Sequence, residues 1–255
     1  MNQPCPILVI NLDRSADRLM RISQELSDIG LAFERVRAID AKGLSPTSAP
    51  EPSLISRFHS PLTPTERACC MSHGVALRRA VELDAAAVLV LEDDVSFGPG
   101  FRDFLLHIAS QPELLPDATS LFAQRPRGRC VRIVGHGHRL IESVCPPISA
   151  AAVLWTRAGA RKFIPACDRA ARPIDVERKH WWEWDLSHGW IESPPVKPQP
   201  VSSGQSTIGI RGDKGLTPRI RKHAYHIRFT LAAHAHYLRH RGVRRWLEAQ
   251  APIEN

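Results

Sequence analysis

Residues 85–91 form an uncharged run, Ala-Ala-Ala-Val-Leu-Val-Leu, that ends directly in Glu92, Asp93 and Asp94. Such a run is typical of a strand buried on both faces, as in a sheet flanked by helices. Three adjacent carboxylates repel one another unless a divalent cation or hydrogen-bond donors neutralise them, because each acid raises the pKa of its neighbours. Open α/β sheets bind ligands at this edge, so the run predicts an α/β fold with a ligand site at residues 92–94. A solvated acidic turn is the alternative interpretation.

A first strand is expected at Ile7–Ile10, followed by a polar loop and an amphipathic helix. Ser15 occupies the expected N-cap, and Gly30 stands where a glycine commonly follows a helix. The apolar residues of one helical face are Leu19, Ile22, Leu26 and Ile29. This order suits a nucleotide-binding unit, because a helix N-terminus favours phosphate. Arg14 and Arg18 could contact a diphosphate, or could be surface arginines at a solvated helix start.

A second helix start is expected at Thr63, where Thr63 and Glu66 form a capping box with Pro64 at the first helical position. Ser72 and His73 lie in this helix. They could form a polar pair that faces a ligand, or they could be ordinary core or surface residues.

The basic character of the chain is concentrated near its C-terminus. The formal net charge is +8, and residues 214–245 contain nine Lys or Arg and no Asp or Glu. Apolar residues fall on one helical face of this segment, at Ile220, Ile227, Leu231 and Leu238. We therefore expect a domain over residues 1–208 and a basic helical extension over 209–255. The extension could attract anionic lipid or nucleic acid, or its basic face could simply be solvated.

The cysteines and the N-terminal residues indicate the cellular compartment in which the protein functions. The six cysteines include no C-x-x-C pair and two are adjacent, which argues against a zinc site and a disulfide scaffold and favours a reducing compartment. The apolar run at residues 7–10 is too short for a signal peptide or a membrane span. We expect a cytoplasmic protein, with peripheral contact at the inner face of the membrane through the basic extension.

Several ordered blocks carry a resemblance to a known family. They are residues 10–18, 33–40, 66–73 and 91–95, with weaker matches at 131–133, 158–160, 173–175, Gln199 and 206–208. With these blocks the chain resembles the bacterial lipooligosaccharide galactosyltransferases of glycosyltransferase family 25, the Lex and Lgt type, which are related to collagen galactosyltransferases. The resemblance covers about residues 7–208. It implies a GT-A-like (Rossmann-like) nucleotide-sugar-binding sheet flanked by helices, a UDP-sugar donor, usually UDP-galactose, and Mn²⁺ or Mg²⁺.

The resemblance also implies roles for the donor-side residues. Asp94 would bind the metal that bridges the diphosphate. Glu92 and Asp93 would hold the ribose or complete the metal shell. The remaining residues would line the nucleotide and phosphate side or lie close to it, and they are Asn11, Arg14, Arg18, Ser72 and His73.

On the acceptor side, the family inverts the anomeric centre, which requires a carboxylate that takes the proton of the attacking hydroxyl. Asp175 matches the family's acidic position, with Glu177 and Glu183 in reserve. Arg132, Trp182 and Glu183 are the acceptor-binding candidates, for a lipooligosaccharide, another glycan or a lipid-linked acceptor. The chain departs from the family at Ala152-Val153, where an aromatic residue is common, and the acid that often follows the Arg132 position is missing. Both departures concern the acceptor.

Three other functions compete with transfer. A donor-binding paralogue without turnover would keep the acidic motif. A basic nucleic-acid-binding protein would use the C-terminal segment; three acids at a strand end would repel a polyanion, so we expect no nucleic acid partner. A phosphohydrolase with an aspartyl nucleophile would need Asp-x-Asp, whereas here Glu92 comes first.

Overall fold

The computed structural model describes residues 5–44, 58–121, 129–134, 137–193, 196–199 and 216–250. The helices are α1 (Ala16–Asp28), α3 (Pro64–Glu82), α4 (Phe101–Ala109), α5 (Arg157–Arg169), α6 (Ile174–Lys179) and α7 (Leu216–Glu248). The strands are β1 (Ile7–Asn11), β2 (Glu34–Arg37), β3 (Ala87–Glu92), β4 (Val95–Phe97), β5 (Ala118–Ser120), β6 (Arg129–Val134), β7 (His138–Glu142), β8 (Ala152–Thr156), β9 (His188–Ile191) and β10 (Val196–Pro198). Short 3₁₀ turns lie at Ala41–Gly43, Pro112–Leu114 and Trp181–Glu183.

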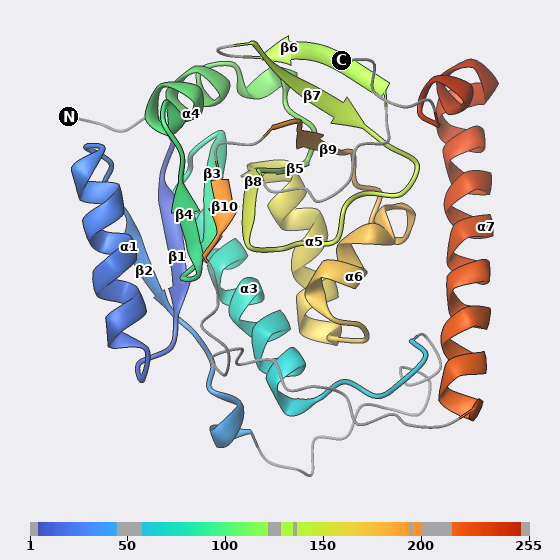
Figure 1. The fold of residues 1–255 in the computed structure, drawn as a ribbon, viewed down its shortest axis with the longest axis horizontal. Coiled ribbons are helices and arrows are strands. Elements are labelled where there is room, and N and C mark those ends of the chain that lie inside the picture. The colour runs from blue at the N-terminus through green and yellow to red at the C-terminus, as the bar shows by residue number, and fades with distance from the viewer. Residues whose placement is uncertain are drawn as a thin grey trace.

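The described strands form an eight-stranded mixed sheet in the order β2-β1-β3-β8-β5-β9-β7-β6, and β10 pairs with β4 in a separate ribbon (Figure 1). β1 is parallel to both β2 and β3, whereas β8 runs antiparallel to β3 and β5. Ile10 pairs with Glu92 across β1 and β3. The polar residues that follow these two strands therefore emerge side by side at one edge of the sheet.

The central strands are buried on both faces, as the uncharged run predicted. In β3, Val88 and Val90 contribute to one apolar core, while Leu89 and Leu91 contribute to the other. The first core also contains residues of α3, α5, α6 and α7, and the second contains residues of α1 and α4. The predicted α/β architecture, a sheet flanked by helices, is confirmed.

The predicted helix ends at α1 and α3 are also present. In α3, Thr63 Oγ1 accepts from the Glu66 amide at 3.2 Å, and Glu66 Oε2 accepts from the Thr63 amide at 2.8 Å. Gly30 follows α1 with a φ of +68°, a conformation that favours glycine. Ser15 precedes α1, but its side chain forms no capping hydrogen bond.

The predicted C-terminal helix is present as α7, but its contact face differs from the predicted apolar face. Phe229, Ala233 and Tyr237 are the residues buried against the domain. Ile220, Ile227 and Leu231 are 59%, 61% and 66% exposed. The predicted face therefore points away from the domain, because the pattern marked an apolar stripe without showing which stripe is covered.

The helix α7 lies at the opposite side of the molecule from α1 in Figure 1. Trp182 stacks on His236 of α7, with ring centroids 5.3 Å apart. The helical path is interrupted at Gly242, which has a φ of +80°. The expected domain boundary at residue 208 and the block at 206–208 lie outside the described residues. Within the described part of the chain, no helix has the length and apolar character needed to cross a bilayer.

Candidate active site

The adjacent ends of β1 and β3 are joined by a buried hydrogen bond. Asn11 is 1% exposed, and its Nδ2 donates to Asp93 Oδ2 at 2.7 Å and to the Ser15 carbonyl at 3.0 Å. Arg35 Nε donates to Asn11 Oδ1 at 3.1 Å. The Asn11 side chain thus uses both its donor and its acceptor within the protein, which indicates that it positions the loops on either side of the site.

Asp93 is neutralised by donors. Its Oδ1 lies 3.1 Å from the Arg18 guanidinium, and Arg21 donates to its backbone carbonyl at 2.6 Å. Asp93 is 7% exposed. A buried carboxylate with these partners is not part of a solvated turn, and it is already satisfied without a ligand.

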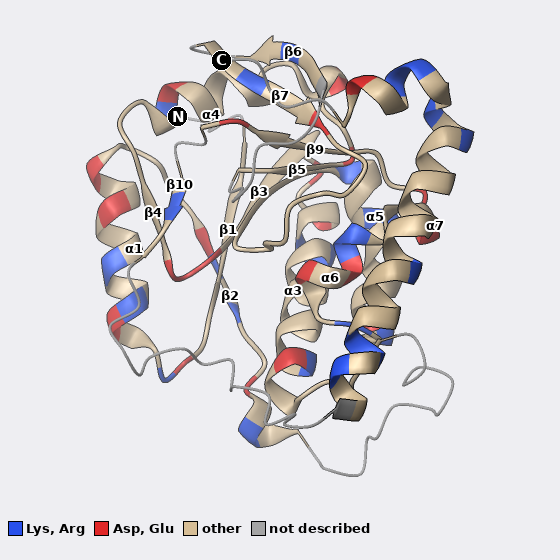
Figure 2. Cartoon of the chain, turned by 45° about the vertical axis from the view of Figure 1, so that its right-hand side comes forward, with Lys and Arg blue, Asp and Glu red and all other residues tan. Residues whose placement is uncertain are grey.

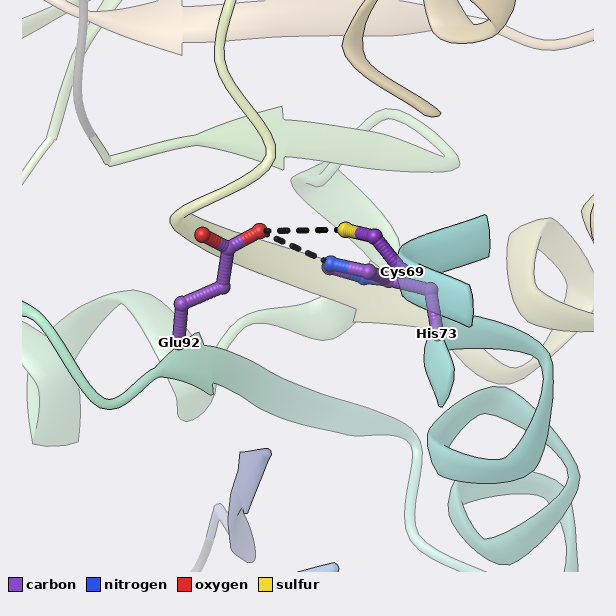
Figure 3. A group of neighbouring side chains, drawn as sticks. All are labelled: Cys69, His73 and Glu92. Atoms are coloured by element: carbon purple, nitrogen blue, oxygen red, sulfur yellow. Dashed lines mark hydrogen bonds and ion pairs between the residues drawn. The ribbon is translucent and has the colours of Figure 1, made fainter. Parts of the chain in front are cut away.

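Glu92 faces helix α3 instead of solvent, and Figure 3 shows its side chain directed at Cys69 and His73. Glu92 Oε1 lies 3.0 Å from His73 Nε2 and 3.9 Å from Cys69 Sγ. Ser72 lies beside them but serves the fold, because its hydroxyl donates to the Ala68 carbonyl at 2.7 Å and accepts from the Ile39 amide at 2.8 Å.

Asp94 is the third acid of the cluster, and its charge is the least compensated. Burial, with the charges of Glu92 and Asp93 adding to it, raises the pKa of Asp94 to about 6, against a smaller lowering by Arg18. Among the described residues, no side chain forms an ion pair or hydrogen bond with its carboxylate. A half-buried carboxylate in this setting fits a hard divalent cation, which takes oxygen ligands.

The three acids line a cavity of about 140 Å³ at this edge of the sheet. The other charged or polar residues that line it are Arg14, Arg18, Thr65, Ser72 and His73. Arg14 also pairs with Asp40, and this contact lowers the pKa of the Asp40 carboxyl. The acids and the arginines therefore line the same cavity, and this arrangement is suited to a diphosphate with its cation.

A second cavity of about 460 Å³ adjoins the first. Glu92 and Cys69 line both cavities, and Asp175 lines the second. Asp175 is in the first turn of α6, and its Oδ1 accepts from the Val176 amide at 2.8 Å. Burial raises the pKa of Asp175, and the charge of Glu92 raises it further. A carboxyl with a raised pKa is better matched to accepting a proton near neutral pH.

Two arginines hold α6 in place. Arg178 is buried and donates to Ser120 Oγ on β5 at 2.5 Å and to the Ser149 carbonyl. Arg172 pairs with Glu177 at 2.9 Å and with Glu183 at 2.7 Å. These contacts fix Asp175 on a rigid element, and they engage the two reserve candidates for the base in ion pairs.

The acceptor-binding candidates are not gathered around Asp175. Glu183 and Trp182 line a third cavity of about 780 Å³, between the domain and α7. Arg132 lies on β6, the edge strand, which four strands separate from β3. None of the three cavities is lined by Arg132.

Sequence reasoning missed four residues that shape the site. Arg21 and Arg35 hold the acidic edge, and Arg178 holds α6. Cys69 lies against Glu92, and its spacing of four residues from His73 is the signal that could have found it, since residues four apart share a helix face. No comparable local signal marks the three arginines, because each acts on a distant part of the chain.

Residues 5–126 match the sequence profile of the family described as "Glycosyltransferase family 25 (LPS biosynthesis protein)". This region of the chain is similar to glycosyltransferase family 25. It contains every residue predicted for the donor side and for the metal, whereas Asp175 and the acceptor candidates lie beyond it. The family relationship therefore concerns the acidic edge of the sheet first.

Curated relatives match part of the chain, and each is described as "Glycosyltransferase 25 family member". The Drosophila pseudoobscura pseudoobscura protein is 30% identical over 130 residues, 48% of this chain and 20% of its own length. The Anopheles gambiae protein is 36% identical over 103 residues, 38% of this chain and 17% of its own. The chain thus spans about a fifth of the length of these relatives.

One solved structure that partly matches the chain is described as "crystal structure of a glycosyltransferase involved in the glycosylation of the major capsid of PBCV-1". It has a TM-score of 0.40 and 16% sequence identity, and the match covers 71% of this chain and 77% of that one.

The raised pKa of Asp94 predicts a pH-dependent effect of Asp94→Asn on stability. The pKa of the carboxyl is about 6 in the folded chain, against an ordinary value of 3.8. Its stabilising contribution is therefore complete below about pH 4 and is lost as the pH rises through 6. Asparagine resembles the protonated acid, so the variant should exceed the wild type by about 1–3 kcal/mol in unfolding free energy above pH 7.

Urea unfolding between pH 5 and pH 8 in the presence of a chelator measures this difference. The advantage of Asp94→Asn should grow with pH. Asp103→Asn, at an exposed acid of α4, should stay within about 0.5 kcal/mol of the wild type throughout. A difference that is constant with pH would contradict the assignment of Asp94 as the uncompensated acid.

Proposed function

We propose that the chain is a metal-dependent inverting glycosyltransferase that transfers a sugar from a nucleotide donor to a glycan. The observation that carries the proposal is the meeting of two cavities at Glu92. One cavity holds the acidic edge with Arg14 and Arg18, and the other holds Asp175. A donor in the first and an acceptor in the second would place their reacting atoms near the shared wall, which is the arrangement that transfer requires.

On the donor side, Arg14 and Arg18 would bind the diphosphate through charge-assisted hydrogen bonds. Asp94 would hold Mn²⁺ or Mg²⁺, with Glu92 able to supply a further oxygen. A bound ion of this kind neutralises the charge that develops on the diphosphate leaving group. Asp93 and Asn11 would act through position, since their polar atoms already bond within the protein.

On the acceptor side, Asp175 would take the proton from the attacking hydroxyl. The first turn of α6 holds its carboxylate at the wall of the 460 Å³ cavity, with the Val176 amide fixing one oxygen. The other oxygen is then available to the acceptor. A base on the face opposite the leaving group gives inversion at the anomeric carbon.

We propose a specific donor and a specific class of acceptor. The family description, with its reference to lipopolysaccharide biosynthesis, supports a lipooligosaccharide or another lipid-linked glycan as the acceptor. The family resemblance supports UDP-galactose as the donor. A donor-binding paralogue without turnover is the second candidate, favoured by Ala152-Val153 on β8, where the family commonly has an aromatic residue.

If Asp175 is the general base, the Asp175→Asn variant should bind the donor with wild-type affinity but should no longer transfer the sugar. Removing a general base costs about 10²–10⁴-fold in rate, and the amide keeps the size and the hydrogen bond of the carboxylate. Calorimetry with UDP and Mn²⁺ measures binding, and release of UDP in the presence of a glycan acceptor measures transfer. Asp103→Asn makes the same change in the first turn of α4 and should keep full activity.

The outcomes separate the two candidates. Donor binding by the wild type with no transfer to any acceptor would favour the paralogue without turnover. Transfer by Asp175→Asn at the wild-type rate would remove Asp175 from the mechanism.

We also propose that α7 contacts an anionic membrane, which would bring the enzyme to a lipid-linked acceptor at the inner face of a cytoplasmic membrane. The exposed residues Ile220, Ile227 and Leu231 form an apolar stripe on the side facing away from the domain. Arginines and a lysine accompany it, and Figure 2 shows basic residues along the helix. The basic residues of α7 are Arg219, Arg221, Lys222, Arg228, Arg239, Arg241, Arg244 and Arg245. An apolar stripe with basic neighbours fits the interface of an anionic bilayer.

The α7 contact predicts sedimentation of the chain with vesicles that contain phosphatidylserine and not with pure phosphatidylcholine vesicles. The double variant Ile227→Glu/Leu231→Glu should reduce binding by at least about tenfold, because two buried apolar side chains contribute several kcal/mol. The control is Met20→Glu/Ile133→Glu, at two other exposed apolar positions, and it should bind as the wild type does. Equal loss in both double variants would contradict a specific role for α7.

A further inference from the structure

We propose that Cys69, His73 and Glu92 form a second cation site, selective for a borderline ion such as Zn²⁺ and chemically distinct from the oxygen site at Asp94. The three residues offer a sulfur, a ring nitrogen and a carboxylate oxygen, and these atoms lie within 4.8 Å of one another. The proposed transfer mechanism gives no role to the Cys69 thiol or the His73 ring, and the two sites share only Glu92.

The ligand set is built from two elements. Cys69 and His73 lie four residues apart on α3, so they share one face of the helix. Glu92 ends β3 and points at that face, as Figure 3 shows. The helix and the strand thus hold the three donor atoms together.

The two separations that Glu92 makes with the other donors lie near those of tetrahedral coordination. Zinc binds sulfur at about 2.3 Å and nitrogen or oxygen at about 2.0–2.2 Å, so two ligands of one ion lie roughly 3.3–3.7 Å apart. Glu92 Oε1 lies 3.0 Å from His73 Nε2 and 3.9 Å from Cys69 Sγ. Side-chain movements of a few tenths of an ångström would bring both separations to the required values.

The site has access to solvent and an open fourth position. Cys69 and Glu92 are half-buried, and both line the two adjoining cavities. An ion bound here would meet the cavity on its remaining side, where a water molecule or a substrate oxygen completes four-coordination. Binding replaces the thiol proton of Cys69, which leaves to solvent.

Ligand chemistry separates the two sites. Thiolate and imidazole prefer Zn²⁺ or Co²⁺, whereas carboxylate oxygens prefer Mg²⁺ or Mn²⁺. The spacing of the cysteines argued against a zinc site, because that criterion looks only for pairs of cysteines. It does not detect a site made of one cysteine, a histidine four residues later and an acid at the end of a strand. In addition, and resting on the proposed function, an ion at Glu92 would occupy the wall between donor and acceptor, so Zn²⁺ should inhibit transfer.

Cobalt reports the site directly, because a Co²⁺–thiolate bond produces charge-transfer absorption in the near ultraviolet that oxygen ligands do not produce. We would titrate the full chain with Co²⁺ in excess Mg²⁺ and then add Zn²⁺. The wild type should develop the absorption, and Zn²⁺ should remove it. Cys69→Ala should lose the absorption and bind Zn²⁺ more than about tenfold more weakly, since even an outer-shell change costs about 10–100-fold.

The matched control is Cys70→Ala. Cys70 is the adjacent cysteine, buried, with its Sγ 3.3 Å from the Arg172 carbonyl, and its variant should retain the absorption. Absence of the absorption in the wild type, or its persistence in Cys69→Ala, would overturn the site. The absorption should also survive Asp94→Asn, so failure of the zinc site and failure of the transfer mechanism give different results.

Discussion

Repulsion among three adjacent carboxylates at one edge of the sheet is the constraint on which the rest of the structure depends. The fold resolves it differently for each acid. Asp93 accepts hydrogen bonds from Asn11 and from the Arg18 guanidinium, and Glu92 pairs with His73. Asp94 has no comparable side-chain partner among the described residues, and burial together with the charges of Glu92 and Asp93 raises its pKa. Two of the three carboxylates thus have side-chain partners in the described part of the protein, and the third, Asp94, has none there.

Contacts between distant segments hold the surroundings of this edge in place. The parallel pairing of β1 with β3 brings Asn11 next to Asp93, and α3 brings His73 to Glu92. On the other side of Glu92, the ion pairs of Arg172 and the hydrogen bonds of Arg178 fix α6 and thereby Asp175. Side chains held by buried polar networks keep their geometry without help from a ligand.

Much of this could be predicted from the sequence where local chemistry decides. The uncharged run before Glu92, the Thr63–Glu66 capping box and Gly30 each depend on neighbours in the chain, and each was predicted correctly. The clustering of Arg14 and Arg18 with residues 92–94 followed from the rule that ligands bind at the carboxyl ends of strands.

The remainder depends on contacts that sequence spacing does not encode. The structural use of Asp93 requires Arg18 and Arg21 from α1, which local reasoning about an acidic motif cannot supply. The covered face of α7 depends on which domain surface it meets, and there Phe229 and Tyr237 are buried instead of the predicted stripe. The mixed strand order likewise places Arg132 on a distant edge strand.

The most direct test of the central claim is a crystal structure of the chain with UDP and Mn²⁺, with manganese located by its anomalous scattering. We expect an anomalous peak within coordination distance of an Asp94 oxygen, in contact with the diphosphate, in the cavity that Arg14 and Arg18 also line. A diphosphate bound elsewhere, or bound in this cavity with manganese away from Asp94, would contradict it.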